Sequence, residues 1–272
     1  MKEDILLNEI IKKIEHVNLV SNTFFRKDFS KFKSSKFKFT IKALNMLFIK
    51  IGYINSGILE AYSSKNFYVI NILKRTLIEA YFKHLYVFTR SLREDSDNVG
   101  KEYVNILKSA EDLSALKLIS NYGKESNLFL NIKETKWSLK GDQNKEIETV
   151  GKKFDLKQIF HELLKGVISK NEQNDDVSKA FKEKFFTRYI NEYADSSSFI
   201  HAGSYSDKIF ESFQLLKDKE KIFERFLKES FSLYEYAVKN TFLFFGLIDQ
   251  ELNCYNKIIE NIFIKDGKEP QK

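Results

Sequence analysis

The sequence predicts an all-α fold, a single multi-helix bundle of mostly antiparallel helices. Only 1 Pro and 10 Gly occur in 272 residues, which is too few turn residues for a β-sandwich or a β-barrel. Apolar residues recur at helical spacing along most of the chain. The connections between these stretches are mostly short, as they are between antiparallel neighbours in a bundle. The apolar fraction of 43% is sufficient for a hydrophobic core.

Each expected helix of the first half follows from its apolar spacing and its end signals. Thr40 is an expected N-cap, and the polar residues 63–66 mark a turn. The stretch after this turn is apolar on most sides, which is typical of the central helix of a bundle. The expected helices are 4–20, 41–59, 67–89 and 99–120, with a polar connection over 93–98.

The second half carries weaker signals at its start and stronger ones toward its end. Residues 121–154 have the weakest pattern, and we expect an irregular excursion there with one or two short helices. Asp155 is an expected N-cap, and the last stretch forms one long helix or two, with a break at Gly246. The expected helices are 156–169, 177–200, 209–216 and 219–264.

These elements form one expected helical domain over residues 1–265. Its core bundle covers about 40–245, a basic segment covers 24–42, and the tail 266–272 is expected to be frayed. The composition excludes several other classes of protein. A single cysteine rules out a disulfide framework and a cysteine-based zinc cage.

No metal, cofactor or membrane is expected either. With four histidines, no spacing typical of a metal site appears, and no glycine-rich phosphate loop precedes a helix. The N-terminus lacks the apolar run of a signal peptide, and no window of about 18 uncharged apolar residues is present. We therefore expect a cytoplasmic protein.

Arg75 and Glu79 form the first candidate constellation. At i, i+4 both project from one face of the expected central helix, and Tyr86 lies about two turns further along a similar stripe. Ile72 and Phe82 lie in or beside the same arc, which is unusual for a fully solvated face. A buried Arg–Glu pair costs desolvation free energy and is not kept for stability alone. An ordinary surface salt bridge is the alternative.

Tyr193, Ser197 and His201 form the second candidate constellation. Their spacing of i, i+4, i+8 places the three side chains on one face if the helix continues through His201. A histidine at a helix end can titrate near neutral pH and act as a general acid or base toward a ribose 2′-hydroxyl. The alternative is a histidine that is satisfied by a neighbouring carboxylate or carbonyl.

The segment Leu73–Tyr81 and the element Ser197–His201 together resemble an uncharacterised bacterial all-helical family with an Arg-x-x-x-Glu helix and a later Tyr/Ser-x-x-x-His element. The resemblance covers roughly residues 40–240. The family is more distantly similar to the HEPN superfamily of helical nucleotide-binding proteins. Many of those are metal-independent ribonucleases in toxin–antitoxin and phage-defence systems. They use an Arg-x(4–6)-His motif, commonly at a dimer interface, whereas eight residues separate Arg75 from His84 here.

This resemblance implies roles for the two constellations. Arg75 would stabilise phosphate charge, His201 would transfer a proton and Glu79 would orient Arg75. The implied function is a metal-independent endoribonuclease in a toxin or phage-defence stress response. A non-catalytic helical module that binds a protein or a nucleic acid is one alternative, and a nucleotide or small-ligand pocket inside the bundle is another. The supporting hydrogen-bond groups would be Tyr86, Tyr193 and Ser197.

Cationic residues are concentrated between Arg26 and Lys42, where seven are opposed by Asp28 alone. Lysines can neutralise phosphates and the intervening Phe rings can stack on unpaired bases, so this segment is a candidate RNA-binding surface. A solvated linker whose Phe residues pack on the bundle is the alternative, because an AT-rich coding sequence also produces Lys and Phe. The expected partners are RNA, another protein or a second copy in a homodimer. The candidate nucleic-acid-binding residues are Arg26, Lys27, Lys31, Lys33, Lys36 and Lys38.

Overall fold

The described residues of the protein are organised as a bundle of helices. They contain no strand, which confirms the predicted all-α class. None of the described helices is long and apolar enough to cross a lipid bilayer. The computed structural model describes residues 4–107, 109–111, 113–114, 141–169, 176–200 and 204–264.

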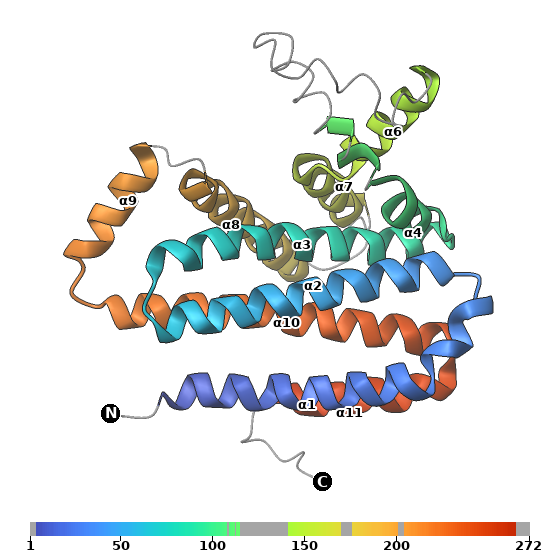
Figure 1. Ribbon diagram of the computed structural model, residues 1–272, viewed down its shortest axis with the longest axis horizontal. Helices are drawn as coiled ribbons and strands as arrows, with labels where there is room; N and C mark the ends of the chain where they lie inside the picture. The colour runs from blue at the N-terminus through green and yellow to red at the C-terminus, as the bar shows by residue number, and fades with distance from the viewer. Residues whose placement is uncertain are drawn as a thin grey trace, which may run out of the picture.

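Helix α3 (Phe67–Glu94) is the central helix that the sequence predicted. It packs against α2 (Lys38–Ser63), α10 (Lys219–Ile248), α8 (Asp176–Ile200) and α7 (Leu156–Ser169). Figure 1 shows α3, α2 and α10 running beside one another, with α8 and α7 on the far side of α3. The central position of α3 explains why its sequence is apolar on most sides.

The remaining helices cover the edges of this arrangement. Helix α1 (Ile5–Lys27) lies beside α11 (Asn253–Phe263) along one edge of the bundle, below α2 and α10 in Figure 1. Helices α4 (Asn98–Lys101) and α6 (Gly141–Lys153) gather near the end of α3. Helix α9 (Ser204–Leu215) follows α8 at the opposite end.

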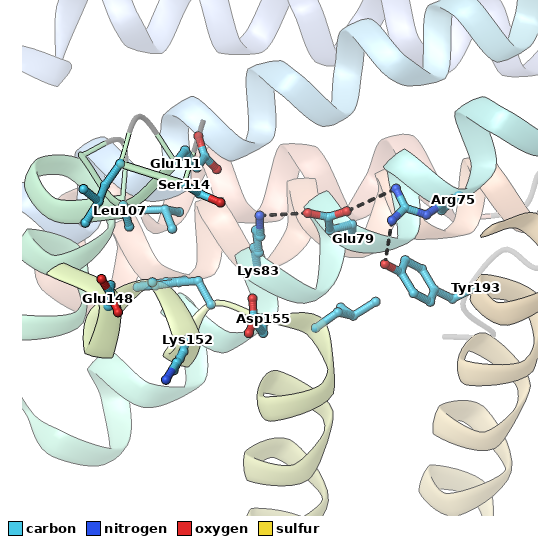
Figure 2. A pocket seen from close by; sticks show the side chains of 15 residues that line it. Arg75, Glu79, Lys83, Leu107, Glu111, Ser114, Glu148, Lys152, Asp155 and Tyr193 are labelled. Carbon is cyan, nitrogen blue, oxygen red and sulfur yellow. Dashed lines mark hydrogen bonds and ion pairs between the residues drawn. The ribbon is translucent and has the colours of Figure 1, made fainter. Parts of the chain in front are cut away.

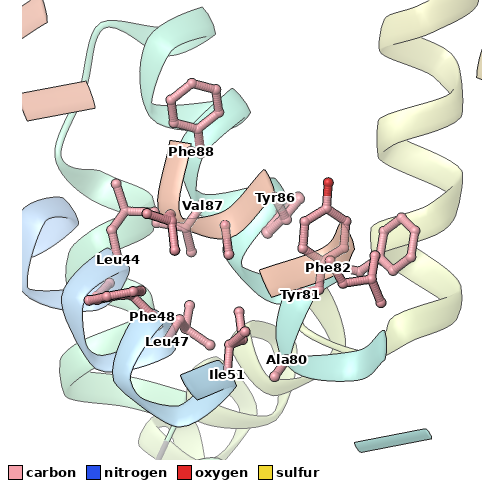
Figure 3. Packing of buried hydrophobic residues seen from close by; sticks show 14 of the residues in the cluster. Leu44, Leu47, Phe48, Ile51, Ala80, Tyr81, Phe82, Tyr86, Val87 and Phe88 are labelled. Atoms are coloured by element: carbon pink, nitrogen blue, oxygen red, sulfur yellow. The ribbon is translucent and has the colours of Figure 1, made fainter. Parts of the chain in front are cut away.

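The main hydrophobic core fills the space between α2, α3 and α10. Leu44, Leu47 and Ile51 of α2 are fully buried, and so is Val87 of α3. Figure 3 shows these side chains between the two helices, whereas Phe82 of α3 is turned toward α7, where it packs against Phe160. Helical spacing of large apolar residues on both helices produces this seam.

The basic segment is folded onto the core and is not an extended linker. Helix α1 continues to Lys27, beyond its predicted end, and a 3₁₀ turn follows over Phe29–Ser34. The ring of Phe24 stacks on the ring of Phe245 with centroids 4.8 Å apart, and the centroid of Phe32 lies 5.3 Å from that of Phe245. Five phenylalanines of this segment belong to the core cluster or pack against it, namely Phe24, Phe25, Phe29, Phe32 and Phe37.

The start of α2 corrects the predicted N-cap. The helix begins at Lys38, and Thr40 is a buried residue of its first turn. Asp97, which lies just before α4, accepts hydrogen bonds from the backbone N–H groups of Phe39 (3.0 Å) and Thr40 (2.7 Å). A carboxylate from another part of the chain thus satisfies the free N–H groups at this helix N-terminus.

The stretch 219–264 forms two helices, which is one of the two predicted arrangements, but the break lies at Asp249 and not at Gly246. Helix α10 continues to Ile248, and the Asp249 side chain accepts a hydrogen bond from the N–H of Glu251 to start a 3₁₀ turn. A Cβ on Gly246 would lie 2.3 Å from Oδ1 of Asn253. Gly246 therefore allows α11 to fold back closely onto α10.

One further element differs from the prediction. The expected helix over 99–120 starts as α4 and continues as a π-helix over Glu102–Leu107. The excursion over 121–154 contains a short helix, as expected, because 141–153 form α6. Residues 115–140 and the tail 266–272 lie outside the described part.

His84 is a neutral histidine in the core between α3 and α10. The hydroxyl of Thr241 donates to the carbonyl of Ala237 (2.8 Å), so Nε2–H of His84 donates to Thr241 Oγ1 (2.8 Å). Nδ1 of His84 has no hydrogen-bond partner among the described residues. Complete burial lowers the pKa of His84 to about 3, because a charged imidazole there would lose its hydration.

A substitution at Gly100 tests the contact between α4 and α2. A Cβ at this position would lie 2.2 Å from the backbone nitrogen of Thr40. We expect Gly100→Ala to lower the free energy of unfolding by about 3 kcal/mol, because backbone must move. Gly52→Ala is the matched control, since its Cβ would meet the Tyr234 side chain at an ordinary 3.8 Å. This substitution should raise the free energy of unfolding by about 0.5–1 kcal/mol, because alanine favours a helix over glycine. Equal urea midpoints for the two variants would contradict this account.

The burial of neutral His84 predicts a pH dependence of stability. The unfolded histidine binds a proton near pH 6.5, whereas the folded one does so near pH 3. The contribution of neutral His84 to the free energy of unfolding is therefore fully present above about pH 6.5. As the pH decreases below this value, the free energy of unfolding falls by up to about 1.4 kcal/mol per pH unit. The free energy of unfolding, measured with urea at pH 5–7.5, should depend less steeply on pH in His84→Gln than in the wild type. Exposed His16→Gln should keep the wild-type slope, and equal slopes for wild type and His84→Gln would refute the assignment.

Candidate functional site

Arg75 is held against α8 by the two residues that the sequence placed on one stripe. Its Nη2 donates to the Tyr193 hydroxyl (2.9 Å) and its Nε donates to Ser197 Oγ (3.1 Å). The Ser197 hydroxyl donates to the backbone carbonyl of Tyr193 (2.6 Å), so its lone pairs are available to Arg75. The guanidinium carbon also lies 4.9 Å from the centroid of the Tyr193 ring. Helix α8 therefore fixes the orientation of the guanidinium plane.

Glu79 extends this contact along α3. Its Oε2 lies 3.6 Å from Nη1 of Arg75, and its Oε1 lies 2.9 Å from Nζ of Lys83. Burial acts to raise the pKa of the Glu79 carboxyl, but the ammonium of Lys83 and the guanidinium of Arg75 lower it below its ordinary value. Glu79 is therefore ionised at neutral pH and stabilises both cations.

The row Arg75–Glu79–Lys83 forms one wall of a cavity of about 550 Å³. Figure 2 shows the row with Tyr193 at one end, whereas Glu111 and Ser114 lie toward the other end. The side chains of Arg75 and Lys83 are 22% and 12% exposed, so the cations are sheltered but accessible from the cavity. The rest of the lining includes Leu107, Ala110, Leu113, Glu148, Gly151, Lys152, Phe154, Asp155 and Leu156.

Cations and carboxylates are mixed along the lining, because Glu79 lies between Arg75 and Lys83, and Lys152 lies on the same side as Glu148. The size of the cavity is typical of a pocket for a small molecule. An anionic group can bind to the guanidinium of Arg75, and hydrogen-bond donors can bind to the carboxylate of Glu111. The sequence signal for Glu111 and Ser114 is weak, because they come from a stretch without a distinctive motif.

Of the predicted catalytic and supporting residues, the structure brings together Arg75, Glu79, Tyr193 and Ser197. His201 lies outside the described residues, so its proposed proton transfer stays a prediction.

Tyr86 belongs to a different cluster. Its hydroxyl accepts a hydrogen bond from Arg90 (2.9 Å), and its ring packs edge-on against Phe154. Arg90 also pairs with Glu102 (3.1 Å), which in turn pairs with Lys153 (2.5 Å). Tyr86 therefore helps to join α3 to the π-helix and α6, and the expectation that it supports Arg75 is wrong.

The predicted RNA-binding lysines and Arg26 are all exposed. Lys31 pairs with Asp28 (3.0 Å) and Glu251 (3.4 Å), and Lys36 pairs with Asp95. The Phe rings between them pack on the core, so they do not form a platform for stacked bases. The surface offers positive charge to a phosphate backbone, and its role in RNA binding stays a prediction.

A buried charge cluster beside Arg75 is the feature that the sequence reasoning missed. The Lys74 side chain is 3% exposed, and its ammonium lies 2.5 Å from Glu229 and 3.2 Å from Glu192. Arg188 contacts both of these carboxylates from the outer side. The cluster joins α3, α8 and α10. The apolar surroundings of Lys74 in the sequence were its one visible signal.

Comparisons with protein families, with curated proteins and with solved structures found no match for this chain. Among the residues that the structure describes, no group of three histidine, cysteine or acidic side chains is placed to hold a metal ion.

A double-mutant cycle tests whether the Lys74 cluster holds the three helices together. Lys74→Met leaves two carboxylates without their buried partner, and we expect a loss of about 3 kcal/mol in the free energy of unfolding. Lys74→Met/Glu229→Leu should cost less than the sum of the single variants, by about 1–3 kcal/mol. Additive losses would show that the two residues do not interact.

The control for this cycle is an ion pair on the surface. Lys221 and Asp218 are 2.8 Å apart, but their side chains are 78% and 70% exposed. Lys221→Met should change the free energy of unfolding by less than about 0.5 kcal/mol, because solvent screens exposed pairs. Urea unfolding of all variants at one pH provides the comparison.

Proposed function

We propose that the protein binds a nucleotide in the cavity that is lined by Arg75, Glu79, Lys83 and Tyr193. The observation that carries this proposal is the guanidinium of Arg75, which Tyr193, Ser197 and Glu79 hold at the edge of a cavity of nucleotide size. A pre-oriented guanidinium pairs with phosphate through two parallel hydrogen bonds and does not have to be ordered on binding.

The distribution of charge supports a nucleotide over a simple anion. Three cations and four carboxylates line the cavity, so the pocket as a whole does not attract anions strongly. An inorganic phosphate could contact Arg75, but it is too small to reach Glu111 and Ser114 as well, which lie toward the other end of the cavity. A nucleotide places phosphate near Arg75 and Lys83, and its base amino and ribose hydroxyl groups can donate to Glu111 and Ser114.

The resemblance to HEPN proteins leads to a second proposal, in which the phosphate belongs to RNA. The grouping of Arg75, Glu79, Tyr193 and Ser197 favours it, because these are four of the residues that the resemblance assigned to the site. Arg75 would stabilise the phosphodiester charge and His201 would remove the proton of the 2′-hydroxyl. A toxin or phage-defence role in the cytoplasm would follow, whereas a non-catalytic interaction module would use the same residues for architecture alone.

Isothermal titration with AMP, ADP and ATP tests nucleotide binding. We expect saturable binding to the wild type and an affinity at least about tenfold lower for Arg75→Gln, since a charge-assisted pair is lost. Tyr193→Phe should weaken binding by a smaller factor, because the guanidinium loses one of its anchors. Arg93→Gln is the control, since Arg93 is exposed and outside the cavity.

Two results would contradict the proposal. One is the absence of nucleotide binding to the wild type, and the other is an unchanged affinity in Arg75→Gln. Incubation with single-stranded RNA distinguishes the second proposal. Cleavage by the wild type and loss of cleavage in folded His201→Ala would favour the ribonuclease, whereas intact RNA with retained nucleotide binding would leave binding alone as the function.

A further inference from the structure

A second cavity, of about 450 Å³, lies between α8, α9 and the first turns of α3 and α10. Its walls are built from buried phenylalanines. Phe67 and Phe213 are stacked with centroids 3.8 Å apart, and Phe199 meets Phe67 edge-on at 5.9 Å. Figure 1 shows α9 standing apart at this end of the molecule. The fourth aromatic wall is Phe226.

Polar side chains interrupt this aromatic lining. Asn71 and Ser196 are 6% and 2% exposed, and both line the cavity. The Asn71 amide nitrogen donates to the carbonyl of Phe67 (2.8 Å), and its amide oxygen is a hydrogen-bond acceptor. A ligand with polar atoms at its ring edge matches this surface better than a plain hydrocarbon chain does.

The rim of the cavity carries a positive charge. The charged residues that line it are three cations and two carboxylates, an excess of one positive charge: Lys74, Lys208 and Arg225 against Glu192 and Asp195. Lys74 is buried between Glu192 and Glu229, whereas the Arg225 side chain is 64% exposed. Nε of Arg225 forms an ion pair with Glu229 at 3.6 Å. Because most of its side chain is exposed, Arg225 can also contact an anionic group at the rim.

Arg225 also borders a neighbouring hollow of about 500 Å³. Three other cations line this hollow, namely Arg188, Lys221 and Lys228, against the carboxylates of Glu224 and Glu229. An anionic group at Arg225 would lie beside these cations while the rest of the ligand occupied the aromatic cavity. Positive charge on this side complements an anion.

We propose that this aromatic cavity binds a small aromatic anion, with its ring among the phenylalanines and its anionic group at Arg225. Edge-to-face contacts with Phe67, Phe199 and Phe213 would hold the ring, because aromatic pairs prefer this geometry. The site is separate from the nucleotide pocket, since it shares none of the residues that line that pocket.

Fluorescence titration with 8-anilinonaphthalene-1-sulfonate, an aromatic anion, tests the site. The wild type should bind one molecule saturably, and Arg225→Gln should raise the dissociation constant about tenfold. Ser212→Phe should also abolish tight binding, because residue 212 is exposed on α9 and its new ring would fill the cavity. Arg93→Gln should bind as the wild type does. Unchanged binding in both pocket variants would overturn the proposal.

Competition defines the chemistry of the ligand. 2-Naphthoate should displace the probe at a concentration at least about tenfold lower than uncharged 2-naphthol or flexible decanoate does. Equal displacement by 2-naphthol would show that the charge is not recognised, and stronger displacement by decanoate would show an acyl site. Displacement by inorganic phosphate alone would also refute the aromatic requirement.

The Arg75→Gln variant separates this proposal from the proposed nucleotide site. It removes the guanidinium of the first pocket and leaves every residue of the aromatic cavity in place. We expect it to bind the probe with wild-type affinity. Loss of probe binding in folded Arg75→Gln would show that the probe occupies the first pocket, whereas failure of nucleotide binding would not affect the aromatic site.

Discussion

Lys74 reaches a carboxylate on each of two other helices, Glu192 on α8 and Glu229 on α10. Its ammonium is almost completely shielded from water, so any shift of α3 along its neighbours would leave a buried charge without a partner. Adjacent residues on a helix point about 100° apart. The contact that fixes Lys74 therefore also fixes Arg75 against Tyr193 and Ser197. The geometry of the candidate site depends on this pairing.

The contact between α3 and α8 divides the surroundings of α3 into two chemically different spaces. Arg75 faces a cavity with many ionisable groups, whereas Lys74 borders one with phenylalanine walls. A charged network and an aromatic cluster thus lie within one helical turn of each other. Because the same two helices border both cavities, a change in their spacing would alter both.

Local sequence patterns were enough to predict the all-α fold and the residue pairs on α3 and α8 that form one side of the site. The i, i+4 spacing of Arg75 and Glu79 and of Tyr193 and Ser197 correctly placed each pair on one helix face. The partnership of Lys74 with Glu229 joins residues 155 positions apart, and no periodicity encodes such a contact. Tyr86 was wrongly predicted to support Arg75, since its position on α3 does not show that its hydroxyl accepts a hydrogen bond from Arg90.

The errors at helix ends have a common physical origin. Thr40 has the right chemistry for an N-cap, but a carboxylate from elsewhere satisfies the first turn of α2, and the Thr40 hydroxyl instead bonds Ser91 (3.0 Å). Gly246 has the right chemistry for a helix end, but it serves the close approach of Asn253. Tertiary contacts overrode local preference at both positions.

The cap that Asp97 provides has a consequence for synthesis on the ribosome. The first turn of α2 emerges 57 residues before the side chain that completes it. Until α3 has been made and has folded back, the N-terminal amides of α2 depend on water for their hydrogen bonds. The first turn of α2 therefore gains its complete set of hydrogen bonds only when Asp97 and α4 pack against it, although it lies early in the polypeptide.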